Sequence, residues 1–159
     1  IVGYDPNRVE DFVLGRITLG ELEGITKDDQ YEMAKLGHAY IEQGKLDLAR
    51  NVFRGLNVLD PYDAYFQTAL GTIAQREGEL ETAEEHYSRA LEINPYSTAA
   101  LANRGEVRLQ LGRLEESVED LLKAVEVDPE GNEPGTHRAG VLAISVREQL
   151  EQAGLEAEE

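Results

Sequence analysis

The side chains of this sequence that are best suited to acid–base or metal chemistry are three histidines and many carboxylates. His38, His86 and His137 are far apart, Cys is absent, and the chain has no His-Glu-x-x-His motif, nucleophile elbow or Gly-rich phosphate loop. It also lacks the Asp-x-Asp-x-Asp-Gly loop that binds calcium. We therefore predict no catalytic residues, no metal site and no cofactor, and we interpret the dense acids as a solvated surface.

The charge of the chain narrows the class of partner. Lys and Arg number 15 against 32 Asp and Glu, which gives a formal net charge of −17 at pH 7. Because phosphate backbones and anionic lipid headgroups bind clustered positive charge, we expect no nucleic-acid and no membrane partner.

Leu, Ile, Val and Phe make up about a quarter of the chain, above the roughly one-fifth typical of disordered chains, so the chain can form a core. No apolar run is long enough to cross a bilayer, and since the chain begins at Ile1 we expect a trimmed or processed product.

The elements that position the side chains follow a repeat of 34 residues. Equivalent residues recur at this interval in four columns: Pro61, Pro95 and Pro129; Gly37, Gly71 and Gly105; Gly44, Gly78 and Gly112; Leu46, Leu80 and Leu114. A period of this length predicts a repeated helix-turn-helix unit, because each unit buries its apolar face only against its neighbours.

Each column has a physical role in such a unit. The first glycine column lets two helices approach closely, and the second stands where the first helix must stop. Asp-Pro or Asn-Pro marks the turn into the next unit. Large residues in a further column, Phe53, Tyr87 and Leu121, are expected to fill the space between neighbouring units. Residues 30–131 thus resemble three tetratricopeptide repeats, with departures such as Arg104 and Arg108 in the third unit.

The resemblance implies an all-α fold, a right-handed α-solenoid of three tetratricopeptide repeats with an N-terminal helical arm and a C-terminal capping helix. We expect one domain over residues 1–159, with the arm at 1–29, repeats at 30–63, 64–97 and 98–131, and a cap and acidic tail at 132–159. The arm is predicted to form two short helices or one helix with an irregular segment. Thr26 and Thr136 are predicted to cap helices, and Gly154 to end the last one.

The first helix of each unit is expected to line a concave groove. Helical spacing places the second, fifth, ninth and twelfth residues of a unit on that surface. The predicted groove residues are Tyr31, Ala34, His38, Ile41, Tyr65, Thr68, Thr72, Gln75, Ala102 and Glu106, with Asn103 beside them and Ala99 and Leu109 at the ends of the third set. Tyrosines, small residues and few charges suit an extended apolar peptide of a protein client. The alternative is that the protein's own terminal arm fills the groove.

Binding of a C-terminal carboxylate is a second mode of peptide binding for the same surface. Some tetratricopeptide domains hold a partner's C-terminal carboxylate with Lys, Asn and Arg, and Asn103 resembles one asparagine of that clamp. Thr68 and Glu133 stand where its lysines are required, and His137 replaces its arginine. We therefore favour an apolar segment over a terminal carboxylate.

Two stretches resemble a narrower family, the class II chaperones of bacterial type III secretion systems, which hold translocator subunits before export. One stretch is Leu59-Asp60-Pro61-Tyr62-Asp63 with its flanks from Phe53 to Ala83, and the other runs from Phe12-Val13-Leu14-Gly15 to Ile25-Thr26. The resemblance implies a cytoplasmic bacterial chaperone, a homodimer through the N-terminal arm, and a client segment with a Pro-x-Leu-x-x-Pro-like pattern. His38, Ile41 and Leu46 stand where family members often carry aromatic residues, so the client can differ.

Two functions from different classes remain open. The leading hypothesis is a non-catalytic peptide-binding chaperone for an exported, membrane-active client. The alternative is a general tetratricopeptide scaffold or assembly protein in a motility, pilus or envelope complex, which would bind a folded partner. An enzyme requires a pocket with converging titratable groups, and the sequence offers no candidate for one.

Overall fold

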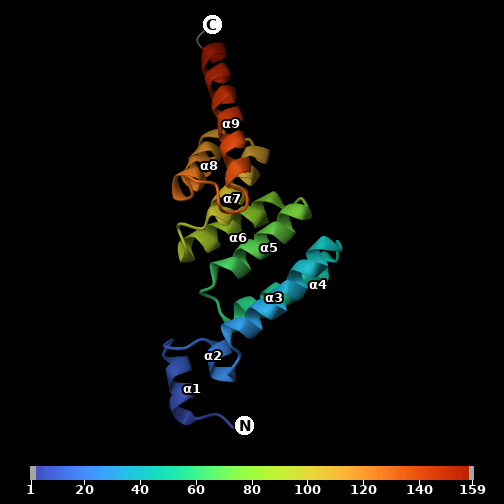
Figure 1. Cartoon of the computed structure of the whole chain (residues 1–159), viewed down its shortest axis with the longest axis vertical. Coiled ribbons are helices and arrows are strands. Elements are labelled where there is room, and N and C mark those ends of the chain that lie inside the picture. The colour runs from blue at the N-terminus through green and yellow to red at the C-terminus, as the bar shows by residue number, and fades with distance from the viewer. Residues whose placement is uncertain (1–2, 158–159) are drawn as a thin grey trace. The chain divides into compact units, whose positions relative to one another are not determined.

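A computed structural model describes residues 3–157, and within this range the chain is helical throughout, with no strand (Figure 1). The helices are α1 (Pro6–Val13), α2 (Leu19–Glu23), α3 (Lys27–Glu42), α4 (Leu46–Leu59), α5 (Ala64–Arg76), α6 (Leu80–Ile93), α7 (Thr98–Gln110), α8 (Leu114–Val127) and α9 (Thr136–Ala157). The all-α repeat fold that the sequence predicts is confirmed. Helices α3 to α8 follow the three repeat segments in pairs.

The chain divides into two compact units, residues 1–66 and 67–159, with the division inside α5. In the first unit, α3 packs against α4, and the core includes Ala49, Phe53 and Leu56 with no exposed surface. In the second unit, α7 packs against α6, α8 and α9, and Tyr87, Ala83 and Val107 belong to one buried cluster. The single-domain organisation over 1–159, with its internal boundaries, stays a prediction.

One glycine in the first helix of each repeat, at Gly37, Gly71 and Gly105, packs directly against a large side chain of the second helix of the same repeat. A Cβ at Gly37 would lie 2.6 Å from Cε2 of Phe53, and a Cβ at Gly71 would lie 2.6 Å from Cε1 of Tyr87. At Gly105 the clash would be with Leu121, at 2.7 Å from its Cγ. Close helix approach at these glycines is therefore confirmed. The large residues pack within their own repeat, not only between repeats as predicted, because the missing Cβ opens the space there.

The turns between helices follow the predicted chemistry. Gly44, Gly78 and Gly112 adopt φ values of 73°, 79° and 77°, the left-handed conformation that glycine tolerates without a Cβ clash, and each lies after the first helix of its repeat. At the end of a repeat, Asp60 Oδ1 accepts a hydrogen bond from Tyr62 N at 3.0 Å, and Asn94 Oδ1 accepts one from Tyr96 N at 3.1 Å. The acceptor side chains before Pro61 and Pro95 therefore close these two turns.

The N-terminal arm forms two short helices, α1 and α2, of which α2 packs against α4. Gly20 permits this contact, because a Cβ there would lie 2.7 Å from Gln30 Nε2 and 3.2 Å from the Leu59 carbonyl oxygen. Thr26 then begins α3 with a capping box: its hydroxyl accepts from Asp29 N at 3.1 Å, and Thr26 N donates to Asp29 Oδ2 at 2.9 Å. The predicted cap at Thr26 is confirmed.

The C-terminal helix differs from the sequence prediction at both ends. Thr136 is the first residue of α9 rather than a residue before it, and its buried hydroxyl donates to Asp128 Oδ2 at 2.7 Å. Asp128 also accepts from Asn132 N and Glu133 N, at 3.0 and 2.7 Å, so this carboxylate holds the loop ahead of α9. Gly154 does not end the helix, which continues to Ala157, because glycine lowers helix propensity without breaking the hydrogen-bond ladder.

Candidate functional site

The first unit carries an aromatic surface made of Tyr31 and His38 on α3 and Tyr65 at the start of α5. The Tyr31 and Tyr65 rings meet edge to face, with centroids 6.0 Å apart. Tyr65 also meets Phe53 at 6.3 Å, and Phe53 itself has no exposed surface. The tyrosines are 43% and 39% exposed, so their rings rest on the core and present one side outward. Edge-to-face packing of this kind holds aromatic side chains rigid before any ligand arrives.

Hydrogen bonds fix the polar ends of these rings. His38 Nε2 is hydrogen-bonded to the Tyr65 hydroxyl, and the Tyr31 hydroxyl donates to Asp63 Oδ2 at 2.9 Å. Burial lowers the pKa of His38, which favours the neutral imidazole at pH 7. Burial raises the pKa of Tyr65, and the hydrogen bond to Asp63 raises the pKa of Tyr31, so both phenols stay protonated. The aromatic surface is therefore uncharged.

Lys27 anchors the edge of the aromatic surface. Its ammonium pairs with Asp60 and with Asp63, the latter at 3.0 Å, and lies 5.9 Å from the centroid of the Tyr31 ring. Burial alone would favour the neutral amine, but the hydrogen bonds to Asp60 and Asp63 outweigh it and raise the pKa of Lys27. These contacts tie the start of α3 to the Asp60-Pro61-Tyr62-Asp63 turn, and thereby position Tyr31 beside Tyr65.

The second unit carries a polar pocket instead. A hollow of about 360 Å³ is lined by α5, α7 and α9 through Thr72, Gln75, Arg76, Asn103, Glu106, Gln110 and Arg138. Beneath it, the Tyr87 hydroxyl donates to Gln75 Oε1 at 2.8 Å and lies 3.3 Å from Thr72 Oγ1. Burial raises the pKa of Tyr87 to about 12, so this hydroxyl remains a donor. The pocket therefore offers amide, hydroxyl and charged groups to a ligand.

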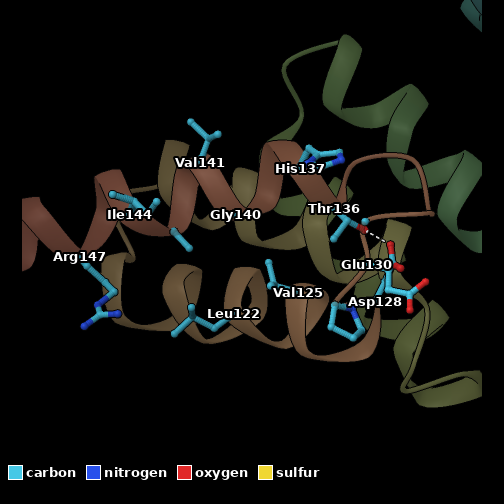
Figure 2. Close-up of a pocket in the computed structure, with 13 residues that line it drawn as sticks. Leu122, Val125, Asp128, Glu130, Thr136, His137, Gly140, Val141, Ile144 and Arg147 are labelled. Atoms are coloured by element: carbon cyan, nitrogen blue, oxygen red, sulfur yellow. Dashed lines mark hydrogen bonds between the residues drawn. The ribbon is translucent and has the colours of Figure 1, made fainter.

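Sequence reasoning missed three residues of this pocket, Arg76, Gln110 and Arg138, of which Arg138 contacts two predicted groove residues. Its Nη2 donates to Asn103 Oδ1 at 2.9 Å, and its Nε lies 3.3 Å from Glu106 Oε2. The sequence places His137 where the carboxylate clamp of other tetratricopeptide domains has an arginine. In the structure, however, His137 lines a different cavity, between α8 and α9 (Figure 2). Arg138 is the next residue in the sequence. Which face of the helix it occupies can be told only once the first residue of α9, Thr136, is known.

The other predicted groove residues are divided between accessible and buried positions. Tyr31, His38 and Tyr65 come together in the first unit, and Thr72, Gln75, Asn103 and Glu106 come together in the second. Ala34, Ile41 and Ala102 are only 1%, 2% and 1% exposed, and Thr68 is also buried. These four side chains offer little contact area, so a role for them in binding stays a prediction.

Across residues 3–157, no group of three or more His, Asp or Glu side chains is placed to hold a metal ion. In the same part of the chain, no helix combines the length and the apolar composition needed to span a bilayer.

Solved structures of similar proteins share this fold. A type III secretion system complex from Aeromonas hydrophila contains a chain that is 28% identical, with a TM-score of 0.79 over 92% of this chain and 99% of that one. SycD of Yersinia enterocolitica, solved with a peptide of the translocator YopD, is 27% identical, with a TM-score of 0.70 over 82% of this chain and 98% of that one. PcrH of Pseudomonas aeruginosa, solved with the chaperone-binding region of PopD, is 27% identical, with a TM-score of 0.71 over 79% and 96%.

The sequence itself matches a family model. No curated protein sequence matches the chain. The tetratricopeptide repeat model matches residues 34–98 and again residues 68–132, and these residues include the glycine and proline columns. The resemblance to type III secretion translocator chaperones is likewise confirmed at the level of structure. The chain belongs to the tetratricopeptide repeat family.

Proposed function

We propose that this protein is a non-catalytic chaperone of the bacterial cytoplasm that holds an extended segment of an exported, membrane-active client. The observation that carries the proposal is the aromatic surface of Tyr31, His38 and Tyr65, which is uncharged, rigid and partly exposed on a protein with a net charge of −17. Such a surface takes up apolar side chains, while the charged body keeps a poorly soluble client in solution.

The polar pocket of the second unit offers groups that suit a peptide backbone. An extended segment carries unpaired N–H and C=O groups that need partners once water is displaced. Gln75 and Asn103 each have an amide that can donate and accept, and both line the hollow in the second unit. Amide contacts in the polar pocket would thus pair the backbone groups of an extended segment.

Similarity to proteins solved with translocator segments supports this choice of client. SycD is solved with a peptide of the translocator YopD, and PcrH with the chaperone-binding region of PopD. We infer the same class of client segment for this chain, an extended segment of an exported, membrane-active protein.

Fluorescence anisotropy tests the proposal with labelled peptides that carry the Pro-x-Leu-x-x-Pro pattern and with scrambled versions of the same peptides. Each of Tyr31→Ala and Tyr65→Ala is expected to weaken binding about tenfold, because truncating a central aromatic contact typically costs over 1 kcal/mol. Tyr96→Ala is the matched control, since Tyr96 is 67% exposed and lies in the turn before α7. Circular dichroism would verify that each variant remains folded.

The outcome discriminates between the two functions. Equal binding by wild type and the double variant Tyr31→Ala/Tyr65→Ala would contradict the aromatic surface as the client site. Equal binding of patterned and scrambled peptides would contradict the sequence preference. Capture of a folded complex with no loss in either tyrosine variant would favour the alternative, a scaffold in a motility, pilus or envelope assembly.

The N-terminal arm bears on the oligomeric state. On α1 and just after it, Val9, Phe12, Val13 and Leu14 are all partly or largely exposed, and the first three follow one another at helical spacing. Tyr31 is 43% exposed and His38 is partly exposed with the arm in place, so the arm leaves both side chains available to a client. Dimerisation through this apolar stripe, which the resemblance implies, stays a prediction.

A further inference from the structure

An apolar groove lies between α8 and α9 in the second unit, on surface that the proposed function does not use (Figure 2). It has a volume of about 450 Å³ and is lined by Leu122 and Val125 from α8 and by Gly140, Val141 and Ile144 from α9. Leu122, Val141 and Ile144 are 45%, 68% and 63% exposed. Three large apolar side chains that share one groove are more than the scattered exposure expected of a surface.

The groove runs beside α9, the last helix in the described part of the chain. On α7, Gly105 lies against Leu121 from the second helix of its repeat. On α9, which packs against α7 and α8, a Cβ at Gly140 would have Val125 Cγ2 as its nearest neighbour, at 3.7 Å. Residues 138 and 140 are two positions apart, so Arg138 in the polar pocket and Gly140 in the groove lie on opposite faces of α9. The groove and the polar pocket therefore use different faces of α9.

We propose that the occupant of this groove is helix α9 of a second copy of the chain, packed antiparallel about a two-fold axis near Gly140 and Val141. In this arrangement Val141 of each copy lies over Gly140 of the other, so a large side chain meets a small one twice. A contact of this kind is isologous, and the two-fold axis closes it as a dimer.

Charge at the two ends of the groove favours the same arrangement. Glu130 lines one end, and Arg147 lines the other (Figure 2). Antiparallel packing brings each Arg147 toward the Glu130 end of the other copy, whereas parallel packing would bring like charges together. The groove is thus complementary to itself in both shape and charge.

The far end of α9 is mostly exposed in the described residues. From Arg147 to Gly154 every residue except Leu150 is exposed. A helix end without tertiary packing gains little stability from its own hydrogen bonds. Pairing with a second α9 would cover part of it.

Disulfide trapping tests the proposal sharply, because the chain has no cysteine. Val141→Cys places one thiol beside the proposed axis and is expected to yield a covalent dimer under mild oxidation. Gln149→Cys is the control on the same helix, since it lies eight residues from Val141 and the two thiols would be roughly 25 Å apart along the helix pair. Failure of Val141→Cys to cross-link, or equal cross-linking by both variants, would overturn the proposal.

Charge reversal provides an independent test by sedimentation. Arg147→Glu and Glu130→Arg are each expected to weaken dimerisation at least tenfold, and the double reversal to restore it. A dimer that is unaffected by either single reversal but abolished by Phe12→Glu would assign dimerisation to the arm and overturn the proposal. Loss of peptide binding in Arg147→Glu without loss of dimer would assign the groove to the client, and would also overturn it.

Discussion

Arg104 of α7 holds Asp120 of α8 in a two-pronged ion pair, with Nε to Oδ2 at 2.8 Å and Nη2 to Oδ1 at 2.7 Å. Arg108, one turn further along α7, adds a contact to the same carboxylate at 3.0 Å and also bonds Glu84 of α6. The two arginines that made the third repeat irregular in sequence thus bind three helices together. Leu36 and Leu70 hold the Arg104 position in the other repeats.

Removing the shared carboxylate should be costly. Asp120 is only 5% exposed, so Asp120→Ala leaves two arginines with a lost partner inside the second unit. We expect a loss of roughly 3 kcal/mol in the free energy of unfolding, measured by urea titration. Asp47→Ala is the control, because the Asp47–Arg50 pair on α4 is exposed and should contribute less than about 1 kcal/mol. Equal losses in the two variants would contradict a structural role for the network.

Adding one methyl group at Gly71 should destabilise the protein. The new Cβ would lie 2.6 Å from the Tyr87 ring, which is fully buried and hydrogen-bonded through its hydroxyl, so the ring cannot move freely. Gly71→Ala is expected to cost about 1 to 3 kcal/mol by thermal or urea unfolding. Gly55→Ala in the interior of α4 is the matched control: no atom lies within 4 Å of its Cβ, and higher helix propensity should stabilise it by up to about 1 kcal/mol. Two changes of the same sign would refute the packing argument.

His38 should make the first unit sensitive to mild acid. Burial lowers its pKa below the usual 6.5, so the unfolded chain binds a proton at a higher pH than the folded chain does. Stability from this residue is present above the unfolded pKa and is lost as the pH falls through the folded pKa. We expect His38→Gln to lose less stability than wild type between about pH 6.5 and 5. Urea midpoints across this range measure the difference. An NMR titration of His38 with a pKa above 6.5 would contradict the prediction.

Asp128 should control the order of the loop before α9. Its carboxylate accepts from Thr136 Oγ1, Glu133 N and Asn132 N, and these hydrogen bonds lower the pKa of Asp128, with Thr136 the largest cause. Asp128→Ala is expected to speed hydrogen exchange at the Asn132 and Glu133 amides, with a smaller effect for Asp128→Asn. Because the pKa is lowered, the same loosening should appear in wild type as the pH falls below about 4. Unchanged exchange at both amides would show that the loop is held by other contacts.

Much of the local structure could be predicted because it depends on period and residue type. The interval of 34 residues predicted helix pairs, the glycine columns predicted close approach and left-handed turns, and Thr26 predicted a helix start. Gly71 under Tyr87 shows why this worked: a position without a Cβ opposite a large ring is a contact that the sequence pattern itself encodes.

The candidate site could be predicted only in part. Helical spacing brought Tyr31, His38 and Tyr65 onto the proposed groove, and the structure places them together. The same spacing also named Ala34, Ile41 and Ala102, which are buried. Spacing gives the face of a helix, but the depth of a side chain on that face depends on which neighbouring helix covers it.

By itself, then, the sequence determined the helices, their pairing into tetratricopeptide repeats and the uncharged character of the tyrosine-bearing surface. Only the tertiary structure decided the pairing of Arg104 with Asp120, the presence of Arg138 beside Asn103 and the apolar groove between α8 and α9. The physical reason lies in the loop before α9. The helix after Asp60 begins at Ala64, whereas the helix after Asp128 begins only at Thr136. That longer connection, held by Asp128, breaks the 34-residue period. The repeat therefore cannot predict which residues of α9 face the rest of the second unit.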